Sequence, residues 1–443
     1  IYQEQIMQIA ARIAGFSLGK ADVLRRAVAK KEKALLAEHR EAFVAGCVAN
    51  GYPAPMAEEL YRQIVRFADY GFNRSHAVSY TLLSYALAYI KAHYPLCFYA
   101  VMLSNASGDR EKMVLYSYEA ARKGIALLPP SVNRSGYRFA VEGEAIRAGL
   151  ATVKHVGSAA KLIIDERKEN GPFADFFDFA VRLLPKGLAR SALEALISAG
   201  AFDELGEERG SLLASIEIAI EHVQLMRPYL EAGGLSLKPK YADAPPLSPD
   251  ERRQREKELL GFAVTPHPAA VCRPLFQAVR AVPAAEVHGS PVVVGGCIAE
   301  LRKTRTKFGE EMAFITVSDE SGELEAVAFP SVYARAAGEL EEGNFVLLAG
   351  TVDMRAGRRQ LVLRRAERLP VSALYIHASL ADRSRLSALK LLLEQHRGST
   401  PVYLYDETKR SLLRLPERYG VALTAPLIDE LIALFGARRL AVK

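Results

Sequence analysis

The sequence predicts a multidomain protein: a mostly α-helical N-terminal half, then an all-β barrel and a small α+β domain. Three observations lead to this fold class. The chain has 443 residues, and domains usually contain roughly 100–200 residues. Apolar side chains recur at helical spacing in the first half, whereas from Pro291 their period becomes two. Half of the residues are apolar and a quarter are charged, which is ordinary for globular domains.

Changes in composition and period divide the chain into six regions. The segment from Gly233 to Glu251 is rich in Gly, Pro and Ser and is the best candidate for a linker. The expected regions are helices over 1–107, a connector over 108–144, short helices with tight turns over 145–215, a helix with the linker over 216–288, the barrel over 289–370 and the α+β domain over 371–443.

The barrel is predicted from five strand-like runs that are separated by glycine-containing turns. A helical stretch from Tyr333 to Leu340 falls between the third and fourth runs. Five strands with a helix in that position are the order of an OB-fold. The residues after the barrel alternate between strand-like runs and two amphipathic helices, Arg383–His396 and Pro426–Phe435.

The hairpin between the first two barrel strands combines cations with an aromatic residue. Cations follow the phosphates of a single strand, and an aromatic ring stacks on a base. The alternative is a solvated hairpin on a barrel that binds protein. The residues of the hairpin are Arg302, Lys303, Arg305 and Lys307, with Phe308 at the tip.

Two segments within 145–215 have the pattern of a helix-hairpin-helix. In the first, the turn Lys154-His155-Val156-Gly157 and Ser158 lie between two helical stretches. A glycine lets the backbone approach a phosphate, and the N-terminus of the following helix favours an anion. The usual pattern has glycine where His155 stands. The second segment repeats the pattern with Lys186 and Gly187; the alternative for each is a plain αα-hairpin.

Cations and donors also gather in the N-terminal helices. Arg25, Arg26 and Lys30 lie along one side of a predicted helix, and Lys31 follows them. A second helix opens with Asn73, Arg74, Ser75 and His76. Donors at a helix start suit a triphosphate or a DNA phosphate, and the alternative is a surface helix capped by Ser75 or Asn73.

Charge and cysteine content add weaker constraints. The net charge of +7 and the pI near 9.1 are compatible with nucleic acid, an anionic membrane surface or no particular partner. The four cysteines lie far apart without zinc-ligand spacing, which favours reduced thiols in a cytoplasmic protein. We find no pattern typical of a signal peptide or a membrane span. The chain begins with a helix that reads as buried, which suggests a cut through a larger protein.

Several segments resemble the alpha subunits of bacterial DNA polymerase III, the replicative polymerases of family C. The resemblance covers nearly the whole chain, and the segments appear in the family's order. The resembling segments include YQEQIMQIA, SLGKADVLRRAVAKK, FNRSHAVSYTLLSYALAYIKAHYPLCFYAVMLS, LLPPSVNRS, VKHVGSAAKLIIDER, ALEALISAGAFDELG and EKELLGFAVTPHP.

The resemblance implies roles for each region. Residues 1–107 would form the distal fingers, where the cations and donors named above face the incoming nucleotide's phosphates or the primer-template. The tandem hairpins, matched at Lys154, Val156, Gly157 and Ser158, would hold duplex DNA. The barrel would meet the single-stranded template, the region around the linker would touch the sliding clamp, and the C-terminal tail would face the clamp loader tau subunit.

The clamp-binding motif departs from the family's pattern. The family often has a Gln-x-x-Leu/Met-Phe-like pentapeptide, whereas the corresponding stretch here reads GGLSLKPKY. Leu235 and Leu237 are the residues that would fill a clamp pocket. An alternative is QLMRPY at Gln224–Tyr229, which reads more like a helix.

The catalytic residues of the family are not found in the sequence. Polymerisation requires closely spaced carboxylates that hold two Mg²⁺ ions roughly 4 Å apart, and no Asp-x-Asp occurs here. We therefore expect the Mg²⁺ ligands of the parent enzyme to lie outside this chain, with no catalytic or metal-binding residue within it. The first hypothesis is the C-terminal portion of a polymerase that extends a primer by template-directed dNTP incorporation. The second is a non-catalytic DNA-binding or adaptor module of the replisome.

Overall fold

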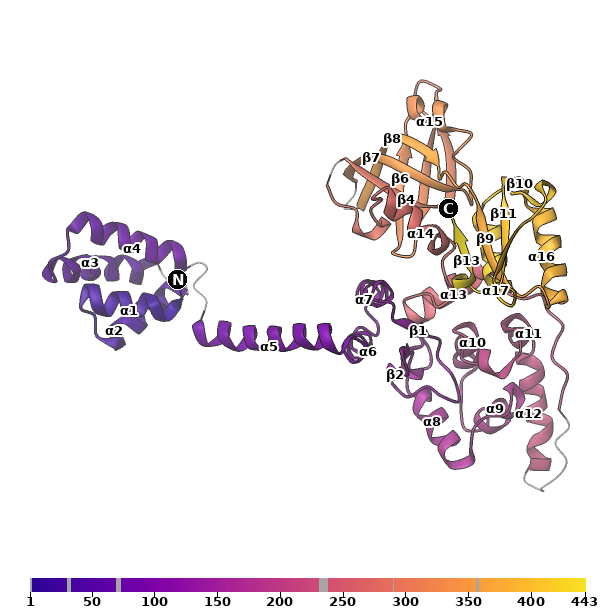
Figure 1. The fold of residues 1–443 in the computed structure, drawn as a ribbon. Coiled ribbons are helices and arrows are strands. Elements are labelled where there is room, and N and C mark those ends of the chain that lie inside the picture. The colour runs from indigo at the N-terminus through magenta and orange to yellow at the C-terminus, as the bar shows by residue number, and fades with distance from the viewer. Residues whose placement is uncertain (1, 30–32, 69–72, 231–237, 290, 356–357) are drawn as a thin grey trace. The chain divides into compact units, whose positions relative to one another are not determined.

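The computed structural model describes residues 2–29, 33–68, 73–230, 238–289, 291–355 and 358–443. The chain divides into two compact units, Ile1–Phe98 and Tyr99–Lys443 (Figure 1). Each unit has its own buried core. The predicted fold class, a helical N-terminal half followed by a five-stranded barrel and an α+β region, is confirmed.

The first unit is helical. Its core contains Ile6, Leu24, Phe43, Tyr61 and Ile64, with the rings of Phe43 and Tyr61 5.4 Å apart. The helices are α1 (Gln3–Ala14), α2 (Leu18–Ala29), α3 (Lys33–Ala49), α4 (Ala54–Ala68) and α5 (Arg74–His93), and α6 (Pro95–Asn105) follows.

Helix α5 is apolar but has no buried residue. Its exposed large side chains include Leu82, Tyr85 and Tyr89. No single described helix is long and apolar enough to cross a membrane, although α5 and α6, a bent pair, meet that test together by length and composition.

The second unit begins with helices and a small sheet. Its sheet has the order β1-β3-β2, with β1 and β3 parallel, and the helices after it bury Phe173, Phe176, Phe179 and Phe202, which pack edge to face. The elements are α7 (Arg110–Arg122), β1 (Ala126–Leu128), β2 (Ala140–Glu142), β3 (Ala145–Arg147), η1 (Leu150–Thr152), α8 (Ala159–Asn170), α9 (Phe176–Leu183), α10 (Arg190–Ser198), η2 (Asp203–Leu205), α11 (Arg209–Ala214) and α12 (Ile216–Leu230).

The described part of the predicted linker packs against these helices. Residues 238–247 have no regular structure, yet Tyr241 stacks on Phe177 at 4.8 Å and the Ala242 N–H donates to Ser215 Oγ at 2.9 Å. Helix α13 (Pro249–Leu260) then begins with a capping box between Ser248 and Glu251. The segment is therefore a coil with fixed contacts over 238–247.

The barrel is closed in the order β4-β5-β6-β8-β7. Val294, Ile315, Ala326, Leu348 and Leu361 fill its interior. The helix between the third and fourth strands begins at Pro330, three residues before the predicted start, because proline suits the first helical turn. The strands and helix are β4 (Val292–Arg305), β5 (Glu311–Ser318), β6 (Glu323–Ala328), α15 (Pro330–Ala336), β7 (Phe345–Arg355) and β8 (Arg358–Arg368), and α14 (Ala269–Ala278) and η3 (Ala284–Glu286) precede them.

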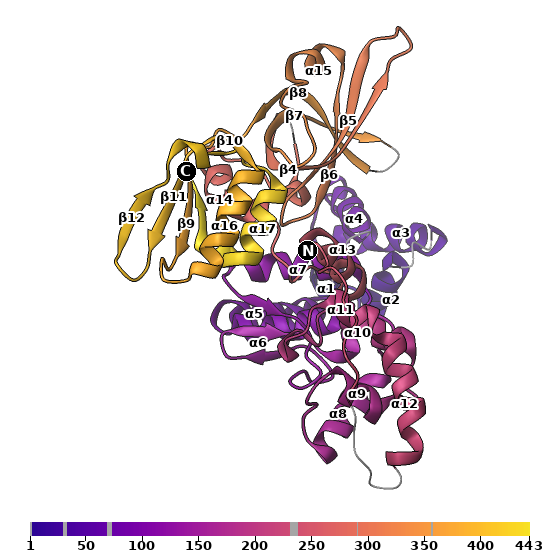
Figure 2. The same ribbon diagram turned by 90° about the vertical axis from the view of Figure 1, so that its right-hand side faces the viewer.

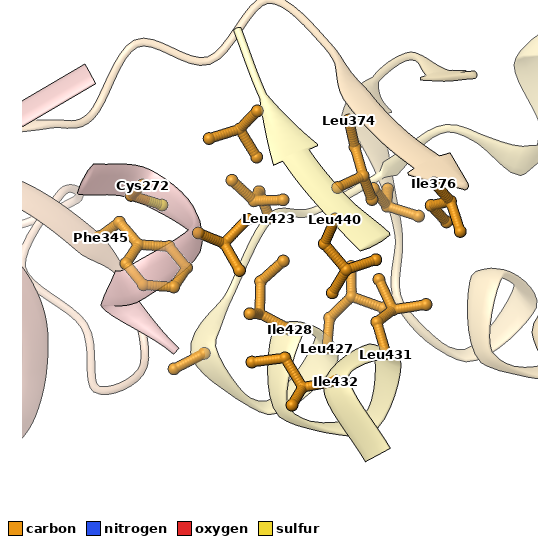
Figure 3. Close-up of a cluster of buried hydrophobic side chains, with 14 of the residues drawn as sticks. Cys272, Phe345, Leu374, Ile376, Leu423, Leu427, Ile428, Leu431, Ile432 and Leu440 are labelled. Carbon is orange, nitrogen blue, oxygen red and sulfur yellow. The ribbon is translucent and has the colours of Figure 1, made fainter. Parts of the chain in front are cut away.

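The C-terminal domain has a four-stranded sheet in the order β12-β11-β9-β13. Cys272 of α14 and Phe345 of β7 lie beside Leu423, Ile428 and Leu440 of this domain in one hydrophobic cluster, so the domain shares a core with its neighbours (Figure 3). The elements are β9 (Leu374–Ala378), α16 (Arg383–Gln395), β10 (Arg397–Thr400), β11 (Val402–Asp406), β12 (Ser411–Arg414), η4 (Glu417–Tyr419), α17 (Ala425–Phe435), η5 (Ala437–Arg439) and β13 (Leu440–Val442).

Candidate nucleic-acid interface

The predicted single-strand-binding hairpin joins β4 to β5. A tight turn closes it, with the Thr306 N–H donating to Glu310 O at 2.8 Å and Gly309 at φ 83°. Phe308 lies at the tip with 90% of its surface exposed. An aromatic ring held in water without packing contacts suits a partner that covers it, because burial of such a ring is favourable.

The hairpin cations lie on two faces. Arg302 is opposite Phe314 in the β4–β5 register, and its guanidinium lies 5.1 Å from the centroid of that ring. Lys303 and Arg305 alternate with Arg302 along β4 and point to the other side, because successive strand residues face opposite sides. Arg305 also lies 3.7 Å from Glu311. The structure therefore places Arg302 on the opposite face from Lys303 and Arg305.

The sequence analysis did not identify an aromatic strip on the outer face of the barrel, formed by Phe314 and Phe329. Ala313 and Ile315 of β5 point into the core, so Phe314 between them faces outward, and Val327 of β6 is its register partner. Phe329, 38% exposed, follows at the end of β6. The second and third strands form the binding face of OB-folds, and counting strand positions from the buried residues would have located this strip.

The first predicted hairpin has the expected backbone conformation. His155 has φ 72° and Gly157 has φ 39°, so histidine occupies the left-handed position where the pattern has glycine. Val156 is buried between them. Within the described residues, the N–H groups of Gly157 and Ser158, just before α8, have no backbone acceptor. Such N–H groups at a helix start can bind a phosphate.

Lys154 has contacts of its own to helix α13. Its N–H donates to Leu259 O at 2.9 Å, and its Nζ lies 3.6 Å from Glu258. The side chains of Lys154 and Glu258 are largely exposed. This ion pair is weak because water screens it, so the cation remains accessible to a phosphate.

The second predicted hairpin joins α9 to α10 through Lys186 and Gly187, which has φ 93°. Lys186 is paired with Glu166 of α8, whose side chain is only 3% exposed. Arg182 Nε also donates to Glu166, at 2.8 Å. Burial opposes ionisation of Glu166, but hydrogen bonds from Lys186, Arg182 and Asn170 outweigh it and lower the pKa to about 2. Lys186 thus ties the two hairpins together.

The N-terminal cations that the structure describes are held by carboxylates. Arg25 Nε donates to Asp22 at 2.9 Å, and Arg26 lies 2.8 Å from the same carboxylate. The hydrogen bond from Arg25 lowers the pKa of Asp22. Lys30 and Lys31 lie outside the described residues.

The start of α5 is capped as expected. Asn73 is the N-cap residue and accepts from the His76 N–H at 3.1 Å. The Glu4 carboxylate accepts from the Arg74 N–H at 3.0 Å, and this hydrogen bond lowers the pKa of Glu4. Arg74 and Ser75 are exposed. A carboxylate therefore stands at the position where we expected a phosphate.

Helix α13 joins three parts of the second unit through buried charges. Arg253 donates to both oxygens of Asp429 in α17 at 2.7 Å. Glu256, fully buried, accepts from Arg209 of α11 at 2.9 Å and from the Thr265 N–H at 2.7 Å. The sequence analysis did not identify these contacts, because the partners are distant in the chain.

Two remaining predictions concern the clamp and metal ions. Leu235 and Leu237 lie outside the described residues, and Gln224–Tyr229 belongs to α12. Among the described residues, no three His, Cys, Asp or Glu side chains gather in a group that could hold a metal ion.

Three family models match the chain. A bacterial DNA polymerase III alpha subunit finger domain matches residues 1–51, a helix-hairpin-helix motif matches residues 124–212, and an OB-fold nucleic acid binding domain matches residues 292–369. The DNA polymerase III subunit alpha of Bacillus subtilis is 41% identical over 461 aligned residues, which cover 100% of this chain and 41% of that protein. The chain belongs to the family of bacterial DNA polymerase III alpha subunits.

The same relationship holds for other alpha subunits. That of Thermus aquaticus is 40% identical over 91% of this chain and 35% of its own length. The chain thus spans about two fifths of the length of the Bacillus subtilis relative. A domain of replication protein A from Methanococcus maripaludis aligns with 20% of this chain at 11% identity, with a TM-score of 0.18 that is too low to support a structural relationship.

Proposed function

We propose that this part of a DNA polymerase III alpha subunit holds the DNA on which a replicative polymerase works. The tandem hairpins hold duplex DNA through the N–H groups before α8 and the exposed Lys154. The outer face of β4, β5 and β6 holds the single-stranded template. The observation that carries the proposal is the row of Arg302 and Phe314 on the binding face of an OB-fold, with Phe308 exposed beside it.

The described residues do not fit the Mg²⁺ ions of the polymerase reaction, because no carboxylates among them gather in a group that could hold a metal ion. We derive no chemical step from them. The parent reaction is dNTP addition to a primer in the cytoplasm, and this chain contributes DNA positioning to it. Purified chain with Mg²⁺, dNTPs and a primer-template is expected to show no primer extension. Extension that survives stringent purification would place the reaction within this chain.

The barrel assignment is tested by salt dependence. Changing Arg302, Lys303 and Lys307 to Ala is expected to weaken binding of a single-stranded oligonucleotide. The slope of log affinity against log salt should flatten by about 2, since each phosphate contact on a single strand contributes roughly 0.7. A matched control changes Arg383, Arg385 and Lys390 of α16 to Ala. An unchanged slope in the hairpin variant would refute the assignment.

The partner proteins form a second proposal. The segment that contains Leu235 and Leu237 is proposed to bind the sliding clamp, and the C-terminal domain is proposed to face the clamp loader tau subunit. What supports both is the family membership of the chain. Loss of clamp binding in the Leu235→Ala and Leu237→Ala double variant, measured by surface plasmon resonance, would support the first. Undiminished binding would move the contact elsewhere.

A further inference from the structure

The C-terminal sheet carries four aromatic side chains in two rungs, which we call the aromatic ladder: Tyr375 with Tyr403, and His377 with Tyr405. The rings of Tyr375 and Tyr403 lie 5.1 Å apart and 17° from parallel. The rings of His377 and Tyr405 lie 4.9 Å apart. Each rung joins the two central strands, β9 and β11, which are parallel and in register.

The ladder lies on the face of the sheet opposite its core. Leu374 and Ile376 of β9 and Leu404 of β11 belong to the core that α17 completes, and the ladder residues alternate with them along the strands. Figure 2 shows α16 and α17 together on one side of these strands. None of the four rings is part of that core, and all four are partly exposed.

The charge around the ladder favours an anionic partner. Arg414 of the edge strand β12 is exposed and lies directly opposite Tyr403 in the register, on the same face. Glu407, at the end of β11, is neutralised by Arg439 at 3.3 Å. Residues 371–443 contain eleven Lys and Arg against seven Asp and Glu. Partly exposed rings on a sheet, with an arginine beside them, match the bases and a phosphate of a nucleic acid.

We propose that the aromatic ladder is a second binding site for single-stranded nucleic acid, separate from the barrel. Successive rungs are two residues apart, or about 6.6 Å along a strand. This is about twice the roughly 3.4 Å rise per nucleotide in one strand of a duplex. Bases on successive rungs must therefore be unstacked from each other, which a single strand permits and a duplex does not. One base stacks on each rung, and Arg414 contacts a phosphate.

The test uses the whole 443-residue chain and a fluorescent oligothymidylate. Binding is measured first with Arg302, Lys303, Arg305, Lys307 and Phe308 changed to Ala, so that the residual affinity comes from outside the barrel hairpin. In that background, Tyr403→Leu is expected to weaken binding at least about fivefold, because stacking is worth roughly 1–3 kcal/mol per base. Tyr403→Phe keeps the ring and the strand and should bind as the background does.

Crosslinking gives a second measurement that does not depend on a variant. An oligonucleotide that contains 5-iododeoxyuridine should crosslink, under ultraviolet light, to peptides with Tyr375, Tyr403 or Tyr405. Absence of such peptides, with equal affinities of Tyr403→Leu and the background, would overturn the proposal and leave the face to a protein partner. If the hairpin variant binds normally and Tyr403→Leu does not, the barrel assignment fails and the ladder stands.

Discussion

The ion-pair cluster around Glu166 gives the sharpest prediction about the tandem hairpins. Changing Glu166 to Gln keeps the shape of the side chain and removes its charge. Lys186 and Arg182 then lose the carboxylate that ties the second hairpin to α8. Because Glu166 is 3% exposed, water cannot replace the lost partner easily.

The magnitude follows from the pKa of Glu166. The pKa falls from 4.5 to about 2, and each unit corresponds to about 1.4 kcal/mol. The full shift would give about 3.5 kcal/mol. Lys186 is 45% exposed and is partly screened, so we expect a loss of about 2–3 kcal/mol at pH 7.

The sign of the pH dependence is fixed by the same shift. A carboxyl whose pKa is lowered by folding stabilises the fold above its unfolded pKa. The contribution of Glu166 is therefore complete above pH 4.5 and is lost as the pH falls towards 2. The difference between the native chain and Glu166→Gln should shrink over that window.

Hydrogen exchange measured by mass spectrometry can localise the effect. Peptides that cover residues 159–190 should exchange faster in Glu166→Gln at pH 7, while peptides from the barrel stay unchanged. Glu169→Gln, an exposed change on the same helix, is the matched control. Equal protection in Glu166→Gln and the control at pH 7 would refute the reasoning.

Three further predictions concern other parts of the chain. Asp429→Ala leaves Arg253 buried without its main partner and should lower the unfolding free energy by about 3 kcal/mol in urea titrations; a loss below about 1 kcal/mol would contradict this. Burial, with Arg253 and Lys257 nearby, lowers the pKa of His267 to about 3. The unfolding free energy should therefore fall as the pH drops from 6.5 towards 3, and it should fall less in His267→Gln. Parallel curves of unfolding free energy against pH for the two proteins would contradict this. Phe308→Ala should leave the melting temperature unchanged because the ring is 90% exposed, yet weaken single-strand binding about fivefold or more in anisotropy titrations.

The barrel could be predicted because its signals are local. The period of two is visible within each strand, and the turns at Gly309 and Gly322 lie directly between the strands they join. The same period also fixes which side chains share a face, so the separation of Arg302 from Lys303 follows from the sequence once one core residue is known. Sequence reasoning grouped these cations by their proximity along the chain and overlooked Phe314.

Other features depend on contacts that no local pattern encodes. Arg253 is 176 residues from Asp429, its buried partner, so no local pattern in the sequence of α13 indicates this contact. At His155, a residue other than glycine adopts φ 72°, which histidine tolerates better than most side chains. A sequence pattern that requires glycine at this position therefore classifies the hairpin as degenerate, although its backbone turn is retained.

The buried contacts of helix α13 also fix its rotation about its own axis. Arg253 and Glu256, three positions apart, bind partners in different parts of the second unit. One residue inserted before Glu256 would turn the rest of the helix by about 100° and separate these two contacts. Four inserted residues would turn it by about 400°, nearly restoring the face, but would lengthen it by about 6 Å. Natural variation in the length of this helix should therefore be rarer than in the segment before Ser248, where coil can absorb it.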